Sequence, residues 1–114
     1  SWIGAGDAWR IPPAAMATAY AELLRRSAEP AAGAAIQGMK LAASAGTAQA
    51  IGIRAMAKTG TASCLSFPRD DGDGFAVALF PREQPRYVLL VRLHGKPGSK
   101  AAETAAAMIR LIRP

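Results

Sequence analysis

Two nearly unbroken apolar runs, separated by a few residues, constrain the fold of this chain more than any other feature. GFAVALF occupies residues 74–80, and RYVLLVRL occupies residues 86–93. Runs of this length and composition are typical of strands that are buried on both faces. Because only residues 81–85 connect them, the two strands are expected to pair as antiparallel neighbours.

Two helices are expected before these strands. Pro12 and Pro13 open the first helix, where a missing N–H costs nothing, and apolar residues then recur at helical spacing. Arg26 ends it close to Pro30, which breaks it. A second, shorter helix is expected over residues 34–43, followed by a loop over residues 44–52.

The rest of the chain completes a small α+β domain. Residues 53–61 are expected to form a further strand, and residues 1–10 a loop. Ser99 is a candidate N-cap for a last amphipathic helix that runs to about residue 112. The sequence therefore predicts a single domain over residues 1–114, in which two N-terminal helices and one C-terminal helix cover an antiparallel sheet of about three strands.

Composition excludes several classes of protein. Hydrophobic residues make up 51% of the 114, which disfavours disorder, and no apolar run approaches the ~18 residues of a membrane-spanning helix. Cys64 is the only cysteine, so an internal disulfide and a cysteine zinc site are excluded. The acidic turn at residues 70–73 lacks the later ligands of a calcium loop. His94 has no triad partners at a recognisable spacing, and no cofactor or metal is expected.

The chain is basic, with a formal net charge of +6. Such a charge fits either an anionic partner or an ordinary solvated surface, and the scatter of the basic residues favours the surface. Aromatic residues make up only 6% of the chain, too few for a base-stacking platform. We therefore expect no nucleic-acid partner.

The segment Lys58-Thr59-Gly60-Thr61 ends the first expected strand. A lysine supplies positive potential for a carboxylate, a threonine hydroxyl can bond to it, and a glycine lets another backbone approach. An exposed strand edge can also pair with an extended peptide. The segment thus has the parts of a docking strip for a peptide that ends in a carboxylate, although the tripeptide alone equally fits a strand end with a solvated lysine.

The surrounding motifs resemble the C-terminal part of a penicillin-binding protein transpeptidase domain. AKTGTA at residues 57–62 is similar to the family's G-K-T-G-T-A strand. IPPAAMATAYA at residues 11–21 occupies the place of the family's T-P-L-Q-x-A-x-A-Y-A helix, and GTA at residues 46–48 precedes the strand as expected. GFAVALFP at residues 74–81 resembles W-F-x-G-x-x-P, with Phe75 in the place of tryptophan.

The resemblance implies a partial transpeptidase-like fold and a set of roles. Lys58 would tune the electrostatics of the site and help to move protons, and Thr59 would bind the substrate carboxylate. Gly60 would leave room for the ligand, and the backbone N–H of Thr61 would be an oxyanion-hole donor. The implied ligands are a peptidoglycan stem peptide or a β-lactam, and the implied location is extracytoplasmic, periplasmic or at the cell surface, with a membrane anchor in the full-length protein.

The family's nucleophile is missing from this sequence. None of the six serines is followed three residues later by lysine, and the absence of asparagine excludes the S-x-N motif. Both motifs belong upstream of the first helix, so we expect a partner segment that carries them, and no catalysis by this chain alone. The apolar face with Met16, Tyr20 and Leu23 is expected to be exposed and to drive association, including with a second copy. The alternative is a non-catalytic peptidoglycan- or protein-binding module derived from the same fold.

Overall fold

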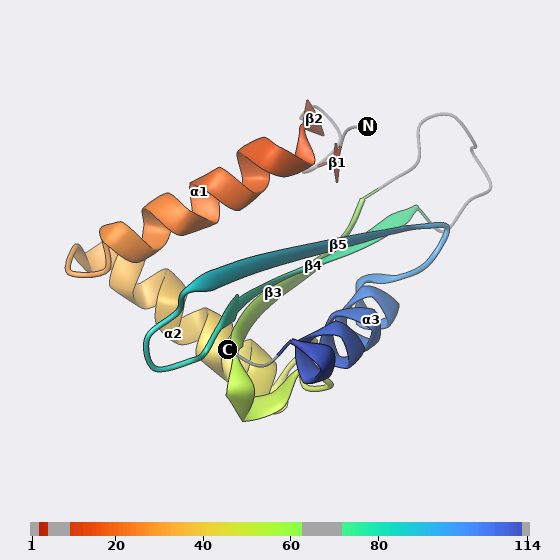
Figure 1. Ribbon diagram of the computed structural model, residues 1–114. Helices are drawn as coiled ribbons and strands as arrows, with labels where there is room; N and C mark the ends of the chain where they lie inside the picture. The colour runs from red at the N-terminus through yellow and green to blue at the C-terminus, as the bar shows by residue number, and fades with distance from the viewer. Residues whose placement is uncertain (1–2, 5–9, 63–71, 113–114) are drawn as a thin grey trace.

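The three expected strands form one antiparallel sheet in the order β3–β4–β5. A computed structural model describes residues 3–4, 10–62 and 72–112 of the chain (Figure 1). In it β3 spans Met56–Ala62, β4 spans Asp73–Phe80 and β5 spans Tyr87–His94. The registers place Lys58 opposite Val77 and Ala78 opposite Leu89. The antiparallel pairing expected from the short connection between β4 and β5 is confirmed.

Three helices accompany the sheet, as the sequence predicted. The helix α1 spans Pro13–Arg25, α2 spans Pro30–Ala45 and α3 spans Gly98–Leu111. The α+β class, with two helices before the strands and one after, is therefore confirmed. Within the described parts of the chain, none of the helices has the length and apolarity that crossing a bilayer would require.

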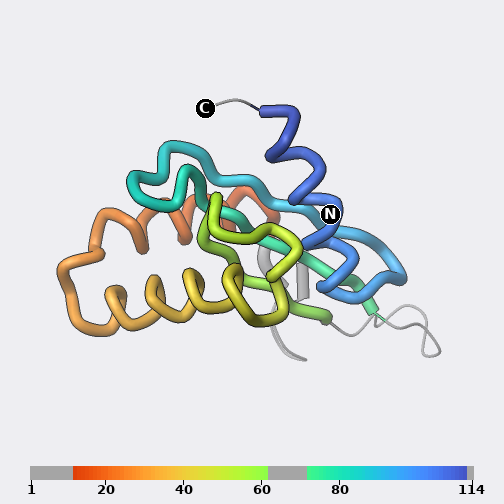
Figure 2. The backbone as a smooth tube through the Cα atoms, turned by 90° about the horizontal axis from the view of Figure 1, so that it is seen from below, coloured from red at the N-terminus to blue at the C-terminus, as the bar shows by residue number. Residues whose placement is uncertain are grey.

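The helices lie in layers around the sheet. In Figure 1 α1 lies on one side of the sheet and α3 lies on the other. The helix α2 packs chiefly against β3, and its antiparallel course beside α1 is visible in Figure 2. Both faces of the central strand β4 are thereby covered, and the sheet divides the core into two clusters.

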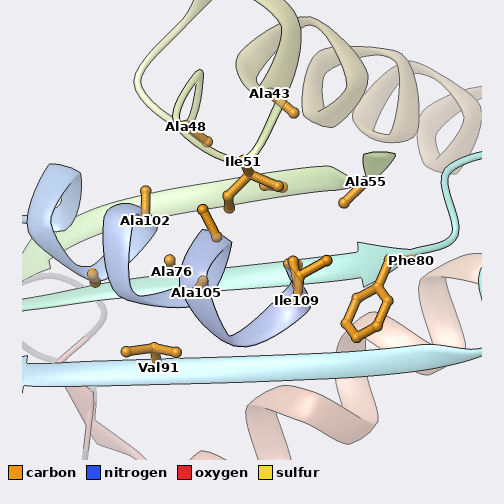
Figure 3. Packing of buried hydrophobic residues seen from close by; sticks show 14 residues of the cluster. Ala43, Ala48, Ile51, Ala55, Ala76, Phe80, Val91, Ala102, Ala105 and Ile109 are labelled. Atoms are coloured by element: carbon orange, nitrogen blue, oxygen red, sulfur yellow. The ribbon is translucent and has the colours of Figure 1, made fainter. Parts of the chain in front are cut away.

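The cluster on the α3 side is built mainly from alanine. Ala102, Ala105 and Ile109 of α3 pack on Ala76 of β4 and on Val91 of β5 (Figure 3). Alanine leaves little space between helix and sheet, so the two backbones approach closely. The second cluster, on the α1 side, uses larger side chains. Its buried members are Met16, Ile36, Met39, Met56, Val77 and Leu79.

The observed helices differ from expectation at their N-terminal ends. The helix α2 begins at Pro30, four residues before the expected start, because the proline that ends α1 also suits the first turn of the next helix. The N-cap of α3 is Pro97, with no capping side chain, so the prediction of Ser99 as the N-cap was wrong. Gly98 follows Pro97 and starts α3 directly against β3, as described below.

Three short elements were not predicted. Residues Gly52–Arg54 form a single 3₁₀ turn, η1, so β3 begins at Met56 and not at residue 53. Gly52 has a φ of +72°, which interrupts an extended chain and explains the delayed start. Near the N-terminus Ile3–Gly4 (β1) pairs with Arg10–Ile11 (β2), in a segment that was expected to be a loop.

Two expectations about burial were also wrong. Of the residues in β5 only Val91 is buried, because β5 is an edge strand; full burial on both faces holds only for the central strand β4. The apolar face of α1 is not exposed either. Met16 is buried, and Tyr20 and Leu23 pack half-buried on the second cluster. Burial raises the pKa of the Tyr20 phenol.

Candidate functional site on strand β3

The Lys58–Thr61 segment lies on an edge strand, as a docking strip requires. Its strand β3 pairs with β4 on one side only, and among the described residues no other strand pairs with β3. The side chains alternate as expected. Lys58 and Gly60 stand on the face that carries Val77 and Phe75, and Thr59 and Thr61 stand on the face toward α3.

Lys58 is exposed and folds back over its own strand. Its Nζ donates a hydrogen bond of 2.5 Å to the carbonyl oxygen of Thr59. Three donors are available on an ammonium group, so the remaining ones can reach a ligand. The structure thus places a positive charge at the strand edge, held by the chain itself.

Thr59 is the one buried polar side chain in the described part of the core, with 6% of its surface exposed. Its hydroxyl donates a hydrogen bond of 2.7 Å to Oγ1 of Thr47. Thr47 belongs to the GTA segment at residues 46–48 and is itself exposed. The hydroxyl of Thr59 is therefore used inside the protein, and Thr47 is the hydroxyl that reaches solvent. The sequence predicts no role for Thr47, although the GTA motif marks its position.

Thr61 is exposed, and its hydroxyl oxygen accepts the backbone N–H of Gly98 at 3.0 Å. This bond satisfies one of the unpaired N–H groups at the start of α3. The helix end is close because Gly98 has no side chain: a Cβ there would lie 2.8 Å from the carbonyl oxygen of Gly60. The hydroxyl proton of Thr61 remains available as a donor to a ligand.

Gly60 faces a side chain and not an open space. A Cβ at Gly60 would lie 2.5 Å from two atoms of the Phe75 ring, its partner across the ladder. The aromatic ring of Phe75 therefore packs directly on Gly60. A ligand on this face would have to displace the ring or lie along the strand edge.

The four site residues are therefore adjacent in sequence but divided between two faces. Lys58 and Thr61 point to opposite sides of the sheet and can act on one ligand only at the outer edge of β3. A ligand that contacts both residues must run along that edge, as an added strand does.

A charged cluster lies at the same end of the sheet as Thr61. Asp73, which opens β4, pairs with Ala62 on one side and with His94 on the other. Its carboxylate accepts hydrogen bonds from the Arg92 guanidinium, and its Oδ1 lies 2.7 Å from Nδ1 of His94. Partial burial acts to raise the pKa of Asp73, but the bonds from Arg92 and His94 outweigh it and lower that pKa.

This cluster was not predicted, because Asp73 was expected in an acidic turn and His94 was considered only as a possible member of a catalytic triad. The available signal was the spacing of Arg92 and His94, which puts both on one face of β5. Asp70 and Asp71, the other members of the expected turn, lie outside the described residues, as does Cys64. Among the described residues, no group of three or more histidines, cysteines and carboxylates could hold a metal ion.

Comparisons with protein-family models, with curated proteins and with solved structures found no match to this chain. What the chain can do must therefore be argued from its motifs and from the geometry of β3.

Proposed function

We propose that this chain is the C-terminal part of a penicillin-binding D,D-transpeptidase domain and contributes the K-T-G strand to a site completed by a segment outside the chain. The substrate would be a peptidoglycan stem peptide, and a β-lactam would occupy the same place. The chain would work outside the cytoplasm, and it would not be catalytic alone.

The observation that carries this proposal is the position of the motif. Lys58 and Thr61 are both exposed on the free edge of a sheet, while the intervening Thr59 is anchored to Thr47. Several further motifs of the family stand in the family's order along the chain. An edge strand with a fixed ammonium group and free hydroxyls suits a peptide that pairs through its main chain and ends in a carboxylate.

In the proposed reaction, the hydroxyl oxygen of a serine on the other segment attacks the carbonyl carbon of the penultimate residue of the stem peptide. The serine loses its proton to a base, the last peptide C–N bond breaks, and the base returns the proton to the nitrogen of the terminal D-alanine, which leaves as an amine, so an acyl-enzyme forms. Lys58 would stabilise the negative charge that develops, Thr61 would supply an oxyanion-hole N–H, and Thr47 with Thr61 would bind the carboxylate. Thr59, which the resemblance implies as the carboxylate ligand, is not used for this role, because its hydroxyl donates to Thr47 inside the protein.

Intact-mass measurement after incubation with a labelled penicillin tests the proposal. We expect no adduct on the chain alone, and one adduct, on the other segment, when the chain is expressed together with the region encoded upstream of it. Lys58→Met should then slow acylation by about 10²–10³. Lys40→Met, which removes a lysine of α2 that lies near Met56 at the opposite end of β3, should leave the rate unchanged.

A covalent adduct on one of this chain's own serines would contradict these roles, as would a Lys58→Met protein that acylates at the normal rate.

The alternative is a binding module that has kept the sheet and lost the nucleophile. It is favoured by the packing of α1, whose apolar face is already covered by the sheet within this chain. Such a module would bind a D-alanyl-D-alanine peptide without any other segment. Amide signals of Thr59 and Gly60 should then shift during an NMR titration, and unchanged signals at millimolar peptide would exclude it.

A further inference from the structure

A second candidate site lies away from the K-T-G strand, at the other end of β3. A cavity of about 630 Å³ opens between η1, the turn that joins β4 to β5, and the C-terminal turn of α3. Phe80 and Ile109 are buried and form its apolar base; both are labelled at one end of the cluster in Figure 3. Ile53 and Ile112 line it as well and are 76% and 40% exposed. None of residues 58–61 lines the cavity.

Three guanidinium groups and one carboxylate also line this cavity. Arg54 comes from η1, Arg82 from the β4–β5 turn and Arg110 from the last turn of α3, and Glu83 is the carboxylate. Within the part of the chain that the structure describes, the side chains of Arg54, Arg110 and Glu83 make no hydrogen bond or ion pair. Positive charge therefore exceeds negative charge around an apolar base, and none of the three cations has a counter-ion among the described residues, since the side chain of Arg82 bonds only to carbonyl and hydroxyl oxygens.

One of the three arginines, Arg82, has its guanidinium held in place by the fold. The Nε of Arg82 donates to the carbonyl oxygen of Ala55 at 3.1 Å, and its Nη2 donates to Lys40 O and Ser44 Oγ. The backbone N–H of Arg82 donates to the carbonyl oxygen of Arg54 at 3.0 Å, which ties η1 to the turn. Less conformational entropy is lost when a ligand binds to a guanidinium that is fixed beforehand, as that of Arg82 is.

We propose that this cavity binds an amphipathic anion: a hydrocarbon chain that ends in a phosphate or carboxylate group. The apolar chain would lie over the buried Phe80 and cover Ile53 and Ile112, whose exposed surface water solvates poorly. The headgroup would lie at the arginines, because guanidinium groups bind these anions through paired hydrogen bonds. The volume lies within the ~300–1,000 Å³ that is usual for small-molecule sites.

The test is an NMR titration of the protein with octyl phosphate, octanoate, octanol and inorganic phosphate, which follows the methyl signals of Ile53 and Ile109. We expect saturable shifts with octyl phosphate and with octanoate. Comparison of the affinities of these two anions shows which headgroup the site prefers. Octanol and inorganic phosphate should each bind at least about tenfold more weakly, since each lacks one half of the interaction. Octanol or inorganic phosphate that binds as tightly as octyl phosphate and octanoate would overturn the proposal.

Variants locate the site. Arg110→Gln should weaken the binding of octyl phosphate about tenfold. Arg25→Gln is the matched control, because Arg25 is likewise an exposed arginine in the last turn of a helix, α1. It should change the binding less than about twofold. Ile53→Ser, at a largely exposed position, should weaken octyl phosphate but leave the weak binding of inorganic phosphate unchanged. Equal effects of Arg110→Gln and Arg25→Gln would place the ligand elsewhere and overturn the proposal.

Discussion

Individual glycines and hydroxyls, more than large side chains, determine how β3 is held. Gly98 lets the start of α3 reach the backbone of Gly60, and the hydroxyl of Thr61 accepts the N–H that this contact brings close. The hydroxyl of Thr59 is bonded inward to Thr47. Each of these contacts depends on one atom that a single substitution would add or remove. The contacts can therefore be tested separately.

Substitution of Gly98 tests the contact between α3 and β3. In Gly98→Ala the new Cβ would lie 2.8 Å from the carbonyl oxygen of Gly60, and neither backbone can move without disturbing the sheet or the helix. We expect a loss of about 1–3 kcal/mol in the free energy of unfolding, measured with urea. Gly38→Ala is the control, because a Cβ at this position in α2 meets nothing within 4 Å. It should stabilise the protein by up to about 1 kcal/mol, and equal effects of the two substitutions would refute the contact.

The acid stability of the protein depends in part on Asp73. Because the pKa of Asp73 is lowered in the folded state, its contribution to stability is present above the pKa of an unfolded aspartate, about 3.9, and is lost as the pH falls through the lower folded value. Asp73→Asn should therefore reduce the free energy of unfolding by about 1–3 kcal/mol near pH 6. The difference between the variant and the original protein should shrink below about pH 4.

Urea unfolding at several pH values measures this difference. Glu103→Gln removes an exposed carboxylate whose only ion-pair partner among the described residues is Lys100, three residues before it on the same helix, so it should have little effect at any pH. A constant difference between Asp73→Asn and the original protein from pH 6 to pH 2 would show that Asp73 does not titrate differently on folding.

At the scale of elements, the edge strand β3 is fixed by three neighbours. The ladder with β4 sets its register, α3 approaches through Gly98, and the turn after α2 reaches it through Thr47. The outer edge of the strand is left to the ammonium group of Lys58 and the hydroxyl of Thr61. This arrangement supports a site whose backbone is rigid and whose ligand-facing groups are few.

A double-mutant cycle measures the link between the turn after α2 and β3. Thr59→Val removes the hydroxyl at nearly constant volume, and Thr47→Val removes its acceptor. We expect each substitution to reduce the free energy of unfolding, by about 1 kcal/mol for the buried Thr59 and less for the exposed Thr47. The effects should not add, and a coupling of about 0.5–1 kcal/mol should appear. Strict additivity would mean that the hydrogen bond contributes nothing to stability.

At the scale of the whole molecule, one sheet separates two cores of different character. The α3 side is packed by alanine at close range, and the α1 side is packed by methionine, isoleucine and leucine. Phe80 is the largest fully buried side chain of the first cluster and stacks on Tyr87 with ring centroids 5.4 Å apart. It closes the end of the sheet beside the arginine-lined cavity.

Phe80 should therefore contribute more to stability than any exposed apolar residue at the same end of the molecule. Phe80→Ala is expected to reduce the free energy of unfolding by about 3–5 kcal/mol, because it leaves a void under α3. Leu111→Ala, at a position that is 85% exposed, should change it by less than about 0.5 kcal/mol. Thermal unfolding followed by circular dichroism compares the two, and similar midpoints would contradict the packing described.

Strong local signals predicted most of the fold. The apolar runs of β4 and β5 and the proline-started helix α1 were expected close to where they occur. The boundaries of helices and strands were predicted wrongly where one residue is compatible with two local structures. Pro30 both ends α1 and starts α2, and Gly52 converts part of an expected strand into a 3₁₀ turn. The burial of β5 was overestimated because a run of apolar residues does not reveal whether a strand is central or at an edge.

The sequence predicted which adjacent residues form the candidate site. It did not predict which of their side chains are bonded inside the protein. The alternation of Lys58 and Thr59 follows from strand geometry alone. That the hydroxyl of Thr59 is bonded to Thr47, twelve residues earlier, depends on how the turn after α2 folds back. The cluster of Asp73, Arg92 and His94 likewise depends on the register of β4 against β5.

The sequence by itself therefore determined the three helices, the three strands of the main sheet, their order, their antiparallel pairing and the segment that carries the K-T-G motif, because periodicity and short connections act locally along the chain. Only the tertiary structure decided which hydroxyls are buried, which strand lies at the edge beside α2, and that three arginines from η1, a turn and α3 meet around one cavity. These features depend on distances between residues that are far apart in sequence, and packing in three dimensions alone fixes such distances.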